Sequence, residues 1–280
     1  MYKYIGIRGH RGAGKNSIAY LLGTAIEYFL ETECWEGFLA SYKKAVQILI
    51  EDGACDLNDM KNGQYFKHVI FDSFSDTAKT TLSQIIGIPA SWMYDDWIKD
   101  ATIIDFNSFN FKRASDKIDL QMMISSRKNS MFDAEQLYEL IKSGENIEGK
   151  EIFLTLREMI SYYSKYVMQK NLGKNVWVKS LEQESSDQER FFSGNKTVYR
   201  IFCDCKFPTE ISYIYKKSGK IVKVNRDNNI KQDTNISDQL LKDPRYDFEL
   251  NLNGNLLDEN TFNDIKTIAF NIINSENKND

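Results

Sequence analysis

The chain of 280 residues is long enough for one large domain or two smaller ones. Its 42% hydrophobic and 27% charged residues are typical of globular proteins that bury a core without disulfides. A formal net charge of −4 argues against a broad basic face for long nucleic acid, but it allows a small anion held by a few cations.

Cysteine usage and the first residues favour a reducing compartment. Cys34, Cys55, Cys203 and Cys205 lack the C-x-x-C spacing of a zinc site, and we interpret the last two as buried strand residues. The N-terminus resembles neither a signal nor a transit peptide, and no apolar run is long enough to cross a bilayer. We expect a cytoplasmic protein (in the host cytoplasm if the chain is viral) with no membrane partner; the oligomeric state stays open, a homodimer included.

The first part of the chain begins with a strand, a glycine turn and a helix. Residues 2–8 read as a short buried strand, 9–14 as a glycine-rich turn, and 15–29 have apolar residues at helical spacing. The expected elements that follow are a helix, a strand and a helix at 35–50, 68–71 and 76–86.

Residues 90–150 contain aromatic and charged residues and short helical runs such as 134–142, with no clear strand. We interpret them as a mostly helical, substrate-side insertion. The elements expected after it are helices at 154–170, 176–182, 208–217 and 261–273 and strands at 198–203, 221–224 and 246–250. Residues 185–195, with Arg190, are predicted to be a mobile loop or lid, and 274–280 a frayed tail.

Strands that alternate with helices predict an α/β fold, in which helices cover both faces of a parallel sheet. Ligands of such folds bind beyond the carboxyl ends of the strands. Polar residues follow three of the predicted strands, in segments 9–17, 72–79 and 204–210. We therefore expect these three segments to meet at one edge of the sheet.

The glycine turn is nearly a Walker A loop, G-x-x-x-x-G-K-[ST]. Its glycines let backbone N–H groups point at a phosphate, and the helix start and Lys15 add positive charge. Asn16 stands where Ser or Thr usually helps to hold magnesium, and Ser17 follows one place later. A plain glycine turn is the alternative, and Arg8 and Arg11 could face either phosphate or solvent. The predicted ATP site consists of Gly12, Ala13, Gly14, Lys15, Asn16 and Ser17.

Further motifs follow in order along the chain. The segments are Phe74-Ser-Asp-Thr-Ala-Lys79, Phe111-Lys-Arg113-Ala-Ser, Thr155-Leu-Arg157-Glu, Asn175-Val-Trp177-Val-Lys179, Val198-Tyr-Arg-Ile-Phe-Cys-Asp204-Cys-Lys206-Phe-Pro-Thr-Glu210 and Gly219-Lys-Ile-Val-Lys-Val-Asn-Arg226. Together with the glycine loop they resemble the phage-type deoxynucleoside monophosphate kinases, a branch of the P-loop kinases. The chain departs from the family's T-P-R-E-L-L-Q-x-x-G-T phrase, because the glutamine, glycine and threonine are missing.

The resemblance implies a three-layer P-loop kinase fold, with residues 1–280 as one domain and 90–150 as the insertion within it. It also implies ATP and Mg²⁺ as cofactors and a nucleoside monophosphate as acceptor. The implied catalytic residues are Lys15, Arg157 and Asp204, and the implied metal contacts are Ser17 and Asp204. The implied acceptor-binding residues are Lys79, Arg113, Arg157, Trp177, Lys206 and Glu210.

Several roles have open alternatives. Trp177 could stack on a nucleobase or pack in the core, Glu210 could accept hydrogen bonds from substrate or cap its helix, and Arg113 could be a plain surface arginine. Two other activities also compete with the kinase: another P-loop enzyme, either a small-molecule kinase or an NTP hydrolase, and a nucleotide-binding protein with little catalysis.

Overall fold

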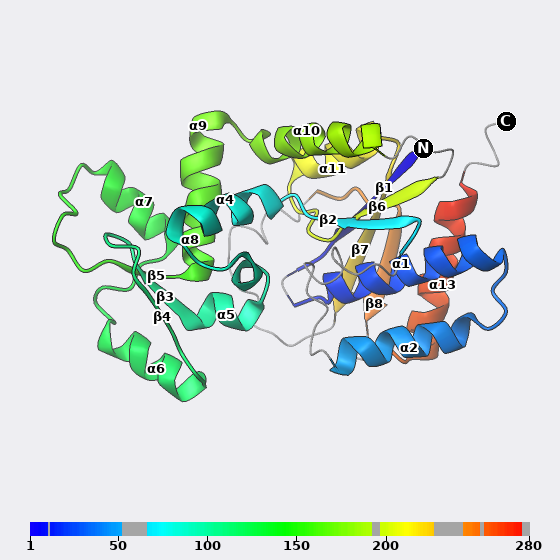
Figure 1. The fold of residues 1–280 in the computed structure, drawn as a ribbon, viewed down its shortest axis with the longest axis horizontal. Coiled ribbons are helices and arrows are strands. Elements are labelled where there is room, and N and C mark those ends of the chain that lie inside the picture. Colours follow the sequence, from blue (N-terminus) through cyan, green and yellow to red (C-terminus); the bar gives the residue numbers. More distant parts are fainter. Residues whose placement is uncertain (11, 52–65, 192–196, 227–242, 253–254, 276–280) are drawn as a thin grey trace. The chain divides into compact units, whose positions relative to one another are not determined.

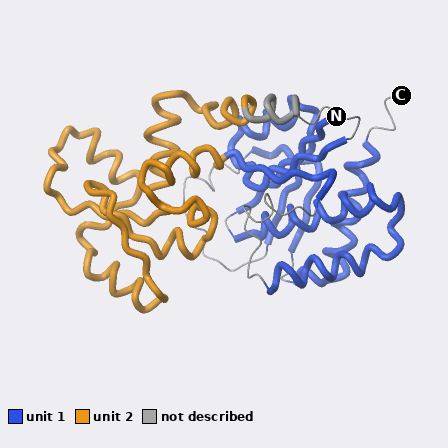
Figure 2. Tube along the Cα trace, viewed as in Figure 1, with its two compact units in different colours: residues 1–74, 185–280 blue, residues 75–184 orange. Residues whose placement is uncertain are grey.

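The structure is a computed structural model that describes residues 1–10, 12–51, 66–191, 197–226, 243–252 and 255–275. It contains two compact units: unit 1 is Met1–Phe74 with Ser185–Asp280, and unit 2 is Ser75–Glu184 (Figure 2). Unit 2 extends beyond the predicted insertion, residues 90–150, on both sides. The expectation of a single kinase domain over residues 1–280 stays a prediction.

Unit 1 is built on a five-stranded sheet in which every described pair of neighbours is parallel (Figure 1). The strand order is β2-β6-β1-β7-β8, so β1 lies in the middle. The predicted α/β class is therefore confirmed, and each strand lies within two residues of its predicted bounds. The strands are β1 (Tyr2–Arg8), β2 (Val69–Asp72), β6 (Val198–Phe202), β7 (Lys220–Arg226) and β8 (Phe248–Leu252).

Helices cover both faces of this sheet. On one face, Gly23 of α1 lies against Phe71 of β2, so closely that a Cβ at Gly23 would be 2.6 Å from the ring. On the other face, the Tyr213 ring of α11 packs edge-on against the rings of Tyr4 and Phe202. The helices of unit 1 are α1 (Lys15–Thr32), α2 (Phe38–Glu51), α11 (Pro208–Lys216) and α13 (Glu259–Asn274). This arrangement is compatible with a three-layer α/β fold.

Unit 2 contains a small antiparallel sheet that the sequence did not predict. Its strands β3 (Thr102–Asp105), β4 (Phe111–Arg113) and β5 (Phe153–Thr155) have the order β4-β3-β5. The expectation of no strand in residues 90–150 was wrong, and so was the start of the predicted helix at residue 154. Strands of three or four residues are too short to show an alternating pattern, and all of β4 is exposed.

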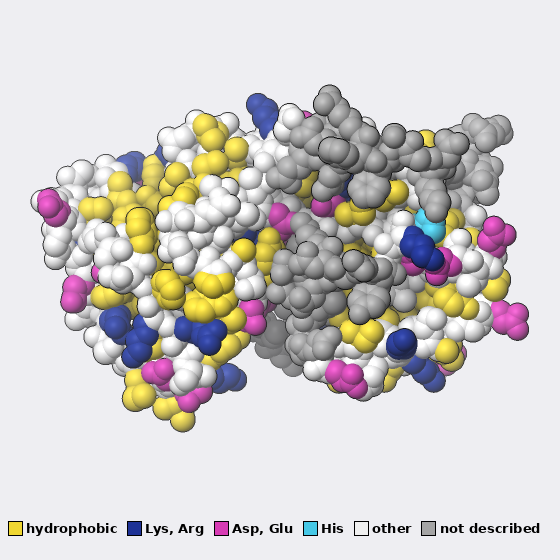
Figure 3. Space-filling model, viewed as in Figure 1, with side chains coloured by type: hydrophobic (Ala, Val, Ile, Leu, Met, Phe, Trp, Pro, Cys, Tyr) yellow, Lys and Arg dark blue, Asp and Glu magenta, His cyan; other side chains and the backbone are white. Residues whose placement is uncertain are grey.

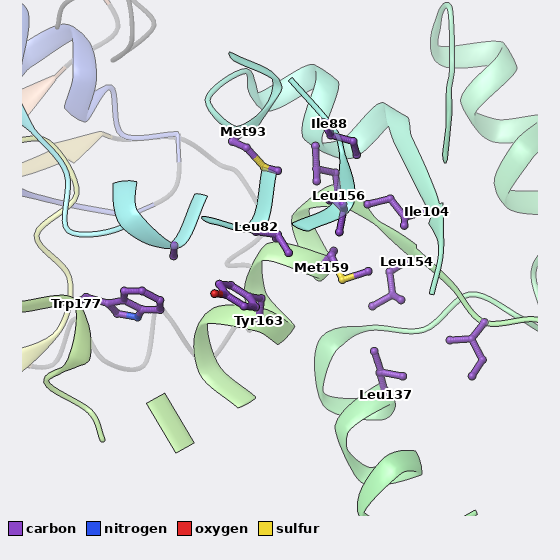
Figure 4. Packing of buried hydrophobic residues seen from close by; sticks show 13 residues of the cluster. Leu82, Ile88, Met93, Ile104, Leu137, Leu154, Leu156, Met159, Tyr163 and Trp177 are labelled. Carbon is purple, nitrogen blue, oxygen red and sulfur yellow. The ribbon is translucent and has the colours of Figure 1, made fainter. Parts of the chain in front are cut away.

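The rest of unit 2 is helical, as expected for the insertion. Its core joins side chains from α4, β3, β5, α7, α8 and α10 (Figure 4). The α-helices are α4 (Asp76–Ile86), α5 (Asp96–Ala101), α6 (Lys117–Ser126), α7 (Ala134–Lys142), α8 (Leu156–Tyr162), α9 (Lys170–Leu172) and α10 (Val176–Phe191), with a 3-10 helix η1 (Ala90–Met93) and a π-helix η2 (Tyr163–Gln169). The helix α10 begins in unit 2, and its residues from Ser185 on belong to unit 1.

The predicted loop at residues 185–195 was wrong over its first part, because α10 continues to Phe191. This stretch is polar but contains glutamate, glutamine and arginine, which are good helix formers, so polarity alone was misleading. Residues 192–196, the Arg190 side chain and most of the predicted tail lie outside the described residues, as does Cys55. Cys203 and Cys205 are buried, as predicted. Among the described helices, none has the length and apolar character needed to cross a bilayer.

Candidate functional site

The loop between β1 and α1 depends on its glycines. Gly12 and Gly14 have φ of 76° and 83°, a left-handed conformation that residues with a Cβ rarely adopt. Gly9 passes so close to β7 that a Cβ there would lie 2.5 Å from the Val224 carbonyl oxygen. Gly14 then provides the N-cap of α1. The predicted strand, glycine turn and helix are therefore present, whereas phosphate binding by the loop stays a prediction.

Lys15 is the first residue of α1, and its charge lies over the loop rather than in the core. Its Nζ donates a hydrogen bond of 2.7 Å to the His10 carbonyl oxygen, at the opposite side of the turn. Asn16 is exposed and Ser17 is half-buried, whereas Ala13 is buried beneath the loop. A lysine and several backbone N–H groups at a helix start suit a phosphate.

Asp204 connects the ends of two neighbouring strands. Its Oδ2 accepts a hydrogen bond of 2.5 Å from the Ser73 hydroxyl, and its Oδ1 accepts one of 2.9 Å from the Phe74 N–H. These residues follow β6 and β2, so the predicted meeting of segments 72–79 and 204–210 at one sheet edge is confirmed for these residues. Ser73, which is buried, was not among the predicted site residues, although a hydroxyl directly after a predicted strand is a usable signal.

A magnesium ion would find a limited set of ligands here. The described residues contain no group of three or more His, Cys, Asp or Glu side chains that could hold a metal. Magnesium, however, usually keeps several waters and uses one or two carboxylates with substrate phosphates. Each oxygen of Asp204 has a hydrogen bond and further lone pairs. Asp204 therefore fits a contact to a metal-bound water, and Ser17 offers a hydroxyl on the first turn of α1.

Glu210 is buried and caps α11. Its Oε2 accepts hydrogen bonds from the backbone N–H groups of Lys206 and Phe207, at 2.7 and 2.8 Å. Burial, and then the nearby charge of Asp204, raise the pKa of Glu210 to about 8. Of the two alternatives for Glu210, the structure favours the helix cap. Lys206 is half-buried and contributes its N–H to this cap.

The position of Arg8 matches neither of the two alternatives considered for it, a side chain that faces phosphate or one that faces solvent. Its side chain is buried, and Nη1 donates to the carbonyl oxygens of Asp243 and Arg245, at 2.7 and 2.9 Å. Arg8 therefore binds backbone rather than solvent, and the phosphate role was wrong because the β1 end is covered by the segment before β8. Arg11 lies outside the described residues.

A pocket of about 200 Å³ adjoins the glycine loop within unit 1. Gly14 and Ser17 form one side, and residues at the carboxyl ends of β7 and β8 form another, including Arg226 and Asn255. Its apolar walls come from Ile50, Leu252 and Leu256. A mainly apolar pocket with a few polar groups beside a parallel sheet edge is a common form of ligand site.

In unit 2, Arg157 is bound to two carboxylates of α5. Its Nε and Nη2 donate to the two oxygens of Asp100, at 2.5 and 3.1 Å, and Nη2 also reaches Asp96 Oδ1 at 3.1 Å. Lys99 makes an ion pair of 2.7 Å with the same Asp96 oxygen. None of the three α5 residues was predicted, because they precede Arg157 by more than 50 positions, with 57 separating it from Asp100.

The other predicted acceptor residues have separate surroundings. The Lys79 ammonium lies 4.6 Å from the Tyr94 ring centroid, and the exposed Arg113 guanidinium lies 4.9 Å from the Trp92 ring. No contact in the described part of unit 2 joins Arg113 to Arg157. Trp177 is 6% exposed and belongs to the core of unit 2, where Figure 4 shows it beside Tyr163. Its burial favours packing over stacking on a base.

The candidate residues therefore form two groups. The glycine loop, Ser73, Asp204 and the pocket belong to unit 1, whereas Lys79 and the charged residues around Arg157 belong to unit 2. On the visible face of unit 2, basic side chains are scattered among apolar and acidic ones (Figure 3). Comparison of the chain with protein-family models and with curated proteins gives no match.

Proposed function

We propose that the protein transfers the γ-phosphate of ATP to a nucleoside or deoxynucleoside monophosphate, giving the diphosphate. The observation that carries this proposal is the connection from β1 through the glycine loop to α1. Gly12 and Gly14 have left-handed backbones there, and Lys15 begins the helix at the carboxyl end of a parallel sheet. Backbone N–H groups, a helix start and a lysine together suit a triphosphate.

On the donor side, Lys15 neutralises charge on the phosphate that moves. The pocket beside Gly14 and Ser17 accommodates part of the nucleoside, with Arg226 and Asn255 as its polar groups. Asp204 would hold a water of the magnesium ion that ATP carries. When bound, that ion supplies charge neutralisation at the phosphates.

On the acceptor side, no strong general base is needed. The phosphate of a nucleoside monophosphate is already an anion at neutral pH, so catalysis consists of positioning and charge neutralisation. This agrees with a chain that contains only two histidines. Arg157 and Lys79 are the proposed acceptor cations, and Arg113 is a third candidate on β4.

The test is an assay of ADP release with ATP, Mg²⁺ and a panel of nucleoside and deoxynucleoside monophosphates. The kinase proposal expects ADP release only with an acceptor, and a nucleoside diphosphate that chromatography identifies. ADP release without any acceptor would indicate an NTP hydrolase instead. ATP binding without turnover on any member of the panel would indicate a binding protein.

A further inference from the structure

The guanidinium of Arg157 is held by one edge. Arginine has five N–H donors in a planar fork. In Arg157, the single N–H of Nε and the N–H groups of Nη2 are directed to Asp100 and Asp96. Within the described part of the chain, Nη1 makes no hydrogen bond. The two carboxylates thus fix the plane of the guanidinium and leave the two N–H donors of Nη1 for another acceptor.

A second cation, Lys99, lies at the carboxylates that hold Arg157. Lys99, with a side chain only 12% exposed, shares Asp96 with Arg157. Burial lowers the pKa of Lys99, the Asp96 contact opposes that shift, and the charges of Lys79 and Arg157 lower it further. Lys79 and Arg157 therefore act electrostatically on Lys99. Lys99 thus places a second cation beside the Arg157 guanidinium.

We propose that Asp96 and Asp100 are positioning residues, which hold Arg157 so that its Nη1 edge binds the phosphate of the acceptor, with Lys99 as a second cation. The identity of that acceptor, a nucleoside monophosphate, rests on the proposed function. An arginine that is already ordered loses less side-chain freedom when it binds, so the two acids increase its affinity for a phosphate. The two N–H groups of Nη1 lie in the fixed guanidinium plane and point in different directions, so Nη1 offers a phosphate oxygen one directed, charge-assisted hydrogen bond.

The opposing account is an ion-pair network that only fastens α5 to α8. It predicts that loss of Asp100 lowers stability and leaves recognition of the acceptor unchanged. The positioning role predicts that loss of Asp100 weakens recognition of the acceptor and has little effect on stability. The two accounts therefore separate in a comparison of KM, kcat and melting temperature.

The test uses the full-length Asp100→Asn variant, in which an amide replaces one oxygen that binds Arg157. KM for the monophosphate should rise about tenfold, which corresponds to the cost of ordering one long side chain. KM for ATP should stay unchanged and kcat should change little. Asp95→Asn is the matched control, because Asp95 is also an acid of this region but its Oδ1 accepts the Ile98 N–H.

Two kinetic results would overturn the proposal. An unchanged KM in Asp100→Asn together with a lower melting temperature would leave only the fastening role. An equal rise of KM in Asp95→Asn would indicate a general disturbance of α5 rather than positioning of Arg157. If Asp100→Asn does not fold, Asp96→Asn provides the same test, because Asp96 Oδ1 also accepts from Nη2 of Arg157, and it should raise KM similarly.

Binding measured without ATP separates this inference from the proposed function. Calorimetry would use the four deoxynucleoside 5′-monophosphates, inorganic phosphate, and the four deoxynucleosides that lack phosphate. Binding of a monophosphate that Asp100→Asn weakens, without any phosphoryl transfer by the wild type, would support the inference while the proposed function fails. If the wild type transfers the phosphoryl group and Asp100→Asn binds the monophosphate as tightly as the wild type, the inference is overturned and the proposed function stands. A wild type that binds neither the monophosphates nor phosphate would overturn the inference as well.

Discussion

Two arginine–aspartate pairs, one in each unit, use the same chemistry in different surroundings. In unit 1, Arg200 of β6 binds Asp72 of β2 at 2.8 Å, and their side chains are 1% and 10% exposed. In unit 2, Arg157 binds Asp100 at 2.5 Å, and their side chains are 22% and 39% exposed. The first pair joins neighbouring strands inside the sheet, whereas the second leaves one guanidinium edge for another partner. The two pairs thus differ in burial, and the more exposed one is the pair that we propose for recognition of the acceptor.

The difference between the two ion pairs is tested most directly by replacing each aspartate with alanine. Asp72→Ala leaves the Arg200 charge buried, so the free energy of unfolding should fall by about 3–5 kcal/mol. Asp100→Ala acts on a partly exposed pair and should cost about 1 kcal/mol or less. Urea unfolding of both variants measures the difference. Equal losses in the free energy of unfolding would show that the two ion pairs contribute equally to stability.

The next largest effect concerns the glycine loop. Lys15→Ala should lower turnover by about a hundredfold or more, because charge stabilisation of the transition state is lost. The melting temperature should stay near that of the wild type, since the ammonium lies over the loop, where it donates to the His10 carbonyl oxygen, and not in the core. Lys44→Ala, an exposed lysine on α2, is the control. Wild-type turnover in Lys15→Ala would contradict the assignment of the phosphate loop.

The two units also differ in how much the sequence predicts. In unit 1, strand order brings Ser73 and Asp204 together, and parallel strands make that meeting predictable from residues that follow apolar runs. In unit 2, Arg157 meets Asp100 through a fold of short strands and helices, without any local pattern. The sequence predicted Arg157 as a site residue, a prediction that stays open, and it predicted neither of the carboxylates that bind Arg157. The burial of Arg8 could not be predicted from the sequence either, because its hydrogen-bond acceptors are backbone carbonyls near β8.

The loss of turnover expected for a substitution of Asp204 is comparable to that of Lys15→Ala or smaller. Asp204→Asn keeps an oxygen for the Phe74 N–H, and the Ser73 hydroxyl can rotate to suit the amide, so the melting temperature should change little. Loss of the charge should lower turnover by about tenfold to a thousandfold. Partial recovery in excess magnesium would support the water-mediated metal contact, and no recovery would favour an orienting role. Wild-type turnover would show that Asp204 only joins the ends of β2 and β6.

The smallest effect is expected at Trp177, and it tests whether unit 2 binds a base through its core. Because the side chain is 6% exposed, Trp177→Phe should lower the free energy of unfolding by about 1 kcal/mol through looser packing. KM for the monophosphate should not change. Stacking on a base is worth about 1–3 kcal/mol, so a stacking role would raise KM clearly. Fluorescence gives an independent measurement: if Trp177 packs only against Tyr163 and its neighbours, monophosphate should change the emission of wild type and variant by the same amount. A ligand-dependent change that disappears in Trp177→Phe would place the acceptor base against this ring and contradict the packing assignment.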